Sequence, residues 1–182
     1  VLLHACAHNP TGVDLNQEQW KELSSVFKER ELIPVFDTAY QGFATGDAEA
    51  DAFSVRHFAE EGHACIATQS FSKNFGLYGE RAGCLSFITS SAEEKAAVES
   101  QIKILVRPMY SNPPAHGARI VSTILNDEKL SAQWYAECKG MADRIGDARI
   151  ALREHLEKGS TRNWEHITSQ IGMFAYTGLT EE

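Results

Sequence analysis

Residues 64–83 read ACIATQSFSKNFGLYGERAG, an apolar run that leads directly into a polar turn rich in glycine. The apolar part, up to Gln69, has the length and the composition of a buried strand. The part that follows carries Lys73 just after two serines, and Arg81 eight positions later. This stretch therefore predicts a strand that delivers an amine and a guanidinium to one end of a sheet.

Two upstream stretches repeat the pattern of an apolar run followed by polar side chains. The run at residues 1–6 leads into a turn that carries Asn9, and the run at residues 32–36 is followed by Asp37 and Tyr40. In open α/β sheets, ligands bind at the carboxyl ends of the strands. We therefore expect Asn9, Asp37 and Tyr40 to converge on the turn of the third strand.

The predicted fold class is α/β, with a mostly parallel sheet flanked by helices. Residues 17–30 place apolar side chains on one helical face, and Asn16 can act as the N-cap. Strand, helix and strand in this order predict a right-handed crossover between parallel strands. The other expected elements are a strand at 82–88, helices at 92–106, 113–126 (with Pro113 or Pro114 in its first turn) and 130–158, and a strand at 171–177.

The side chains at the three strand ends suit one kind of cofactor. A lysine amine can form a Schiff base, and serine and arginine can bind a phosphate. A carboxylate keeps a pyridine nitrogen protonated. These are the groups that pyridoxal 5'-phosphate requires. A lysine in a glycine-rich loop is by itself more often a solvated surface residue, so the prediction depends on all three strand ends together.

Three motifs carry a resemblance to a known family. The Asn-Pro-Thr-Gly turn at residues 9–12, the Asp37-x-x-Tyr40 element and the segment from Ser70 to Arg81 resemble the class I (fold type I) aminotransferases in order and approximate spacing. Within that family, the chain most resembles the aspartate aminotransferases, because residues 104–114 are similar to the segment that selects dicarboxylic substrates. The likeness extends over essentially all 182 residues, which would make up less than half of a typical member.

The resemblance implies specific roles around the cofactor. Lys73 would hold pyridoxal phosphate as a Schiff base and act as the catalytic acid and base. Asp37 would keep the ring nitrogen protonated, and Asn9 and Tyr40 would donate to the ring oxygen. Ser70 and Arg81 would bind the phosphate. The implied cofactor-binding residues are thus Asn9, Asp37, Tyr40, Ser70, Lys73 and Arg81.

The resemblance also implies a substrate site shared between two subunits of a homodimer. Asn9, Arg107 and Ser111 would bind the substrate, and Arg107 would reach the neighbouring subunit's site to pair with the side-chain carboxylate of aspartate or glutamate. The implied reaction is transamination of these amino acids with 2-oxoglutarate or oxaloacetate. The alternatives are an aromatic amino-acid aminotransferase of the same subfamily and a non-catalytic fragment. Arg107 alone could also be a helix-terminal arginine that the helix dipole favours.

The resemblance divides the chain into two parts. Residues 1–139 would be the C-terminal part of the large cofactor-binding domain, and residues 140–182 would be a long connecting helix and the start of a small domain. The family's phosphate loop, the aromatic residue that stacks on the ring and the arginine that binds the α-carboxylate would lie outside these residues. The 182 residues alone are therefore expected to be inactive.

Composition excludes several other classes of function. The net charge of −8 argues against nucleic acid as a partner, because phosphates require a basic face. No apolar run approaches the 18 residues of a membrane span. The four cysteines form no CxxC pair, and His4, Cys6 and His8 lack a fourth ligand, so no metal site is expected. Cysteines this far apart are typical of reduced thiols in an intracellular protein, and we expect a cytoplasmic location. A mitochondrial location stays open because the chain opens inside a strand.

Overall fold

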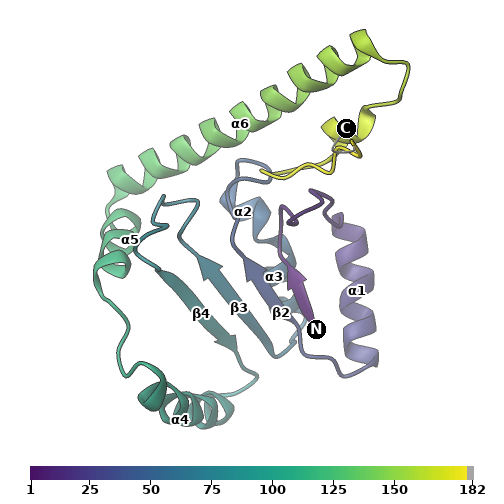
Figure 1. Ribbon diagram of the computed structural model, residues 1–182. Helices are drawn as coiled ribbons and strands as arrows, with labels where there is room; N and C mark the ends of the chain where they lie inside the picture. The colour runs from purple at the N-terminus through teal and green to yellow at the C-terminus, as the bar shows by residue number, and fades with distance from the viewer. Residues whose placement is uncertain (180–182) are drawn as a thin grey trace.

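Four strands form the sheet in the order in which they occur in the chain: β1 (Leu2–His4), β2 (Val35–Thr38), β3 (Cys65–Ser70) and β4 (Gly83–Ile88). The computed structural model describes residues 1–179. The first three strands run parallel and β4 is antiparallel to β3, which confirms the predicted mostly parallel sheet (Figure 1). Because Asp37 pairs with His4 on one side and with Thr68 on the other, the carboxyl ends of β1, β2 and β3 meet at one edge.

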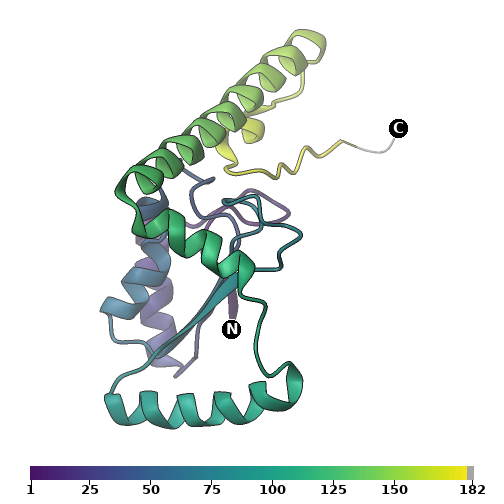
Figure 2. The same cartoon turned by 90° about the vertical axis from the view of Figure 1, so that its left-hand side faces the viewer.

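The hydrophobic core lies between the sheet and two helices, α1 (Gln17–Glu29) and α3 (Phe53–Glu60) (Figures 1 and 2). Phe36 and Phe58 are fully buried and meet edge to face with ring centres 5.2 Å apart. Burial of such a ring stabilises the fold by roughly 1.5–3 kcal/mol. The other buried members of the core are Ala5, Trp20, Phe27, Cys65 and Ala67. Asn16 caps α1 in a capping box, as predicted.

Apolar side chains on the other face of the sheet remain in contact with solvent. Leu85 and Phe87 of β4 are 56% and 37% exposed. They lie opposite Thr68 and Ile66, whose side chains alternate with the core residues of β3. Within residues 1–179, the core helices therefore cover one face only.

Three long helices follow β4: α4 (Ala92–Met109), α5 (His116–Asn126) and α6 (Glu128–Gly159). α4 lies at the end of the sheet remote from the carboxyl edge of the parallel strands and buries none of its residues (Figures 1 and 2). α6 crosses above that carboxyl edge (Figure 1). It is a single helix, as predicted, and it continues without a break through the expected domain boundary at residues 139 and 140. No described helix is both long and apolar enough to span a membrane.

Two helix boundaries differ from the prediction. α4 continues to Met109, so Arg107 and Pro108 lie inside its last turn. α5 begins at His116, so neither Pro113 nor Pro114 lies in its first turn as expected. The helical conformation is disfavoured for a residue that precedes a proline, here Asn112 and Pro113, so α5 does not begin at these residues. The apolar patterns of the sequence also did not predict α3 or the two short helices, α2 (Ala48–Asp51) and α7 (Glu165–Ser169).

The strand expected at residues 171–177 is wrong, because this segment pairs with no strand of the sheet. Several of its backbone groups bond instead to side chains. The guanidinium of Arg149 in α6 donates to the carbonyl oxygens of Gly172 (2.6 Å) and Phe174, and the Gln170 side chain bonds both backbone groups of Tyr176. Residues 180–182, the end of the second expected domain, lie outside the described residues.

Candidate active site

The site is centred on the amine of Lys73, at the carboxyl edge of the sheet. Lys73 Nζ lies 5.1 Å from the centre of the Tyr40 ring and 5.9 Å from that of Tyr78. Lys73 is half-buried, and no carboxylate within residues 1–179 forms an ion pair with it. An amine held against aromatic rings without an ion pair is free to react with an aldehyde.

The connection between β3 and β4 brings the predicted phosphate-binding residues together. Ser70 pairs with Gly83 across this hairpin, which returns Arg81 to the end of β3. Arg81 Nη1 donates to the carbonyl oxygen of Tyr78 (2.9 Å), and Ser70 Oγ accepts from the backbone N–H of Ser72 (3.2 Å). The other guanidinium N–H groups and the Ser70 hydroxyl hydrogen have no partner in the described chain, so they can bind a phosphate.

Asp37 and Asn9 complete this edge of the sheet. Asp37 is partly buried in β2, and its carboxylate accepts no hydrogen bond from residues 1–179. Asn9 is exposed and follows β1, where His4 Nδ1 accepts a hydrogen bond from its backbone N–H (3.2 Å). A partly buried carboxylate without a donor is suited to accept a hydrogen bond from a protonated ring nitrogen.

A buried carboxylate holds the loop that follows Tyr40. Asp51 is 4% exposed and accepts hydrogen bonds from the backbone N–H groups of Gly42 (2.8 Å), Ala44 (3.1 Å) and Thr45 (3.0 Å). The Thr45 hydroxyl donates to the same carboxylate (2.6 Å). This anchor was not predicted, because nothing in the spacing of the sequence distinguishes Asp51 from an exposed acidic residue of a helix.

The C-terminal segment at residues 170–174 also returns to the site. The backbone N–H of Ile171 donates to the carbonyl oxygen of Gly12 (2.7 Å), in the turn that follows Asn9. The Phe174 ring packs edge-on against the Tyr40 ring, with centres 5.5 Å apart. These contacts join segments that are far apart in the sequence, so no local pattern predicts them.

The thiols beside the site are not nucleophiles at neutral pH. Burial raises the pKa of Cys138 to about 11. Burial, and then the negative charges of Asp51 and Asp14, raise the pKa of Cys6 further above its ordinary value. Because the thiolate is the reactive form of cysteine, burial makes these two thiols poor nucleophiles.

Arg107 and Ser111 lie apart from Lys73 within one chain. Arg107 is in the last turn of α4, and Ser111 follows that helix, at the remote end of the sheet (Figure 1). Both residues are exposed and line the same shallow hollow, together with Ile102 and Val106. A single chain therefore does not bring these two predicted substrate residues to the cofactor residues.

Comparisons with known proteins show the family to which the chain belongs. The model of a family described as "Aminotransferase class I and II" matches residues 1–182. The mitochondrial aspartate aminotransferase of Gallus gallus is 61% identical over 100% of this chain and 43% of its own length. The chain belongs to the class I and II aminotransferases. It spans less than half the length of the curated relatives that it matches.

Solved structures share the fold closely. A mitochondrial aspartate aminotransferase from Trypanosoma brucei superposes with a TM-score of 0.95 at 52% identity, over 98% of this chain and 47% of that one. An aromatic-amino-acid aminotransferase from Burkholderia pseudomallei, covalently bound to pyridoxal phosphate, superposes with a TM-score of 0.96 at 50% identity, over 98% and 45%.

The described residues fit pyridoxal phosphate. The site offers an amine without an ion pair at Lys73 and a carboxylate without a donor at Asp37. It also offers unused donors at Ser70 and Arg81 beside the same strand end. An aldehyde, a pyridinium nitrogen and a phosphate are the complementary groups.

Proposed function

We propose that the protein that carries this chain transfers amino groups between aspartate or glutamate and the 2-oxo acids oxaloacetate and 2-oxoglutarate, with pyridoxal 5'-phosphate held by Lys73. The observation that carries the proposal is the position of the Lys73 amine, 5.1 Å from the Tyr40 ring centre at the edge where β2 and β3 end. The identity to aspartate aminotransferases supports the choice of substrate.

Each residue has a distinct task in this proposal. When bound, the cofactor supplies an electron-withdrawing ring that stabilises negative charge at the substrate Cα. Lys73 holds the cofactor covalently and moves a proton at that carbon as base and acid. Asp37 keeps the ring nitrogen protonated through its carboxylate, and Asn9 and Tyr40 donate to the ring oxygen. Ser70 and Arg81 bind the phosphate, the arginine by a charge-assisted pair.

The substrate site is proposed to form in a homodimer. Arg107 of a second copy would pair with the side-chain carboxylate of the amino-acid substrate, and Ser111, which lines the same hollow, would lie beside it. Arg107 is exposed on α4 and lies apart from Lys73 within one chain, which suits a residue that acts across a subunit interface (Figure 1). The name of the Gallus gallus relative favours the mitochondrial location over the cytoplasmic one.

A second candidate is an aromatic amino-acid aminotransferase. It is favoured by the Burkholderia pseudomallei structure, which is nearly as similar to the chain as the Trypanosoma brucei aspartate aminotransferase. The two candidates share the cofactor residues and differ in the substrate side chain.

Kinetics with different amino donors test the proposal. The intact protein should transfer the amino group of aspartate to 2-oxoglutarate with kcat/KM far above that for phenylalanine or tyrosine. Lys73→Ala should remove nearly all of this activity, whereas Lys95→Ala, at an exposed position of α4 outside the hollow that Arg107 lines, should retain it. A preference for the aromatic donors would favour the second candidate, and full activity in Lys73→Ala would overturn the role of Lys73.

A further inference from the structure

Asn74, the residue after Lys73, is buried and joins three parts of the structure. It is 8% exposed, and its side-chain Nδ2 donates to the carbonyl oxygen of Gln41 (3.1 Å), directly after Tyr40. Its own carbonyl oxygen accepts from the indole Nε1 of Trp134 in α6 (2.7 Å). Asn74 thus joins three segments: the turn at residues 71–76, which carries Lys73 and is called the lysine turn below; the loop at residues 40–45, called the tyrosine loop; and α6.

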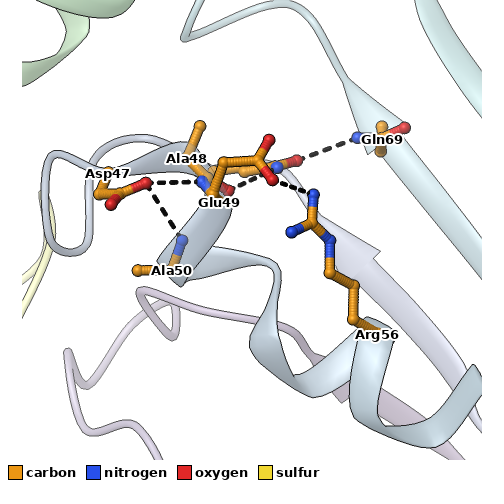
Figure 3. A network of polar contacts seen from close by, with 7 residues as sticks. Asp47, Ala48, Glu49, Ala50, Arg56 and Gln69 are labelled. Carbon is orange, nitrogen blue, oxygen red and sulfur yellow. Dashed lines mark hydrogen bonds and ion pairs between the residues drawn. The ribbon is translucent and has the colours of Figure 1, made fainter. Parts of the chain in front are cut away.

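Gln41 is held firmly on its other side, so its carbonyl oxygen is a fixed anchor point. Gln41 Nε2 donates to the carbonyl oxygen of Ala48 (2.8 Å), and Gln41 Oε1 accepts from Gln69 Nε2 (3.0 Å). Figure 3 labels both partners, Ala48 at the start of α2 and Gln69 on β3. The side chain of Gln41 therefore links the tyrosine loop to β3. The side chain of Asn74 adds a second link, between the tyrosine loop and the residue that follows Lys73.

The turn is equally well fixed on the side of α6. Trp134 stacks on Phe75 with ring centres 4.6 Å apart and an angle of 16° between the planes. Because Phe75 and Trp134 hold the turn without the side chain of Asn74, loss of that side chain should shift Lys73 relative to Tyr40 rather than unfold the turn.

The hydrogen bonding of Asn74 is incomplete. Its side-chain Oδ1 is buried and has no hydrogen-bond partner within residues 1–179. A buried polar atom without a partner costs free energy, so an apolar residue at this position would avoid that cost. The amide is therefore better explained by what its Nδ2 holds in place than by a gain in stability.

We propose that Asn74 is a positioning residue, whose side-chain amide sets the separation between the Lys73 amine and the Tyr40 ring by holding the lysine turn against Gln41. This role rests on the proposed function of Lys73 and Tyr40. Displacement of a reacting group by about 1 Å can cost about a hundredfold in rate, so a hydrogen bond one residue from the lysine has a large effect on turnover. Asn74 itself touches neither substrate nor reacting atoms in this role.

The test compares Asn74→Ala with Asn126→Ala in the intact protein. Asn126 is exposed at the end of α5, and its Nδ2 also donates to a backbone carbonyl oxygen, that of Ser122 (2.7 Å), so the chemical change is matched. In Asn74→Ala, kcat per bound cofactor should fall by about tenfold or more while KM for aspartate stays within about threefold. Asn126→Ala should match the wild type in both.

A spectroscopic readout separates positioning from a merely structural role. If Tyr40 no longer reaches the cofactor ring oxygen, the deprotonated form of the bound cofactor loses a donor. The pH midpoint of the cofactor's absorption band should then move to higher pH in Asn74→Ala and stay in place in Asn126→Ala. Should Asn74→Ala not fold, Asn74→Ser provides the same test, since its hydroxyl is too short to reach Gln41.

The outcomes are distinguishable. An Asn74 variant with a lowered melting temperature but unchanged kcat per bound cofactor and unchanged absorption midpoint would overturn the positioning role and leave the proposed function intact. A wild-type protein that shows no cofactor absorption would overturn the proposed function and this role with it.

Discussion

Gly172 lies against Ala7 so closely that a Cβ on the glycine would be 2.5 Å from the alanine Cβ. Gly172 also has φ of +81°, a conformation that residues with a side chain rarely adopt. Ala7 precedes the turn that carries Asn9, so the C-terminal segment rests directly on one wall of the site. The packing of residues separated by most of the chain thus shapes the position of Asn9.

Gly172→Ala should destabilise the protein more than a glycine substitution that meets only backbone strain. The matched control is Gly62→Ala, because Gly62 has φ of +82° and a Cβ added there would meet no atom within 4 Å. We expect a cost of about 1–2 kcal/mol in the control and about 1–3 kcal/mol more in Gly172→Ala. Chemical denaturation of the two variants measures this difference, and equal costs would show that the contact with Ala7 yields freely.

Asp37→Ala should lower turnover far more than it lowers cofactor occupancy. Loss of the carboxylate removes the group that keeps the ring nitrogen protonated, and that protonation matters most in the transition state. We expect kcat to fall by about a thousandfold or more while absorption still shows bound cofactor. Asp47→Ala, at the exposed N-cap of α2, is the control for loss of a carboxylate outside the site. Near-normal turnover in Asp37→Ala would exclude the proposed role.

Arg107→Asp should reverse the preference among amino donors. A guanidinium that faces a carboxylate across the proposed subunit interface forms a strong pair, and an aspartate in its place repels acidic substrates and attracts basic ones. The wild type should prefer aspartate and glutamate over alanine by orders of magnitude, and the variant should favour arginine or lysine at a reduced rate. Arg119→Asp in α5 is the charge-matched control. Equal wild-type activity on alanine and aspartate would contradict the dicarboxylate assignment.

His63 should make stability depend on pH. It is 9% exposed, and its Nε2 shares a hydrogen bond with Ser24 Oγ (2.7 Å). Burial, and then the positive charge of Lys28, lower the pKa of His63 below its ordinary value. The unfolded state therefore binds the proton at a higher pH than the folded state, so this stability is fully present above the unfolded pKa of about 6.5 and is lost as the pH falls through the folded pKa.

Melting temperatures between about pH 7.5 and pH 5.5, a range that spans the ordinary histidine pKa, test this coupling. The decrease on acidification should be smaller in His63→Gln than in the wild type, whereas a change at exposed His155 (His155→Gln) should leave the decrease as it is. Parallel curves for all three proteins would show that His63 does not contribute.

Much of the fold follows from local sequence patterns. The strands at residues 2–4, 35–38, 65–70 and 83–88 correspond to apolar runs, and α6 follows from its long amphipathic repeat. The segment at residues 171–177 has the same apolar character as a strand, but Arg149 and Gln170 take its backbone groups. Side-chain partners of this kind depend on the tertiary structure, so no pattern within the segment predicts them.

The candidate site is predictable in part for the same reason. Lys73, Asp37 and Tyr40 could be placed at strand ends because each follows an apolar run. Asn74 and Asp51 could not be identified, because their roles come from partners that only folding brings close. Asn74 contacts Gln41 and Trp134, and Asp51 binds the loop that follows Tyr40.

The central claim is that Lys73 holds the cofactor, and chemical reduction tests it most directly. The intact protein with bound pyridoxal phosphate would be treated with borohydride, digested, and its peptides mapped by mass spectrometry. We predict one modified peptide, with the reduced cofactor on Lys73. A label on Lys95 or Lys103, or on no lysine at all, would contradict the claim.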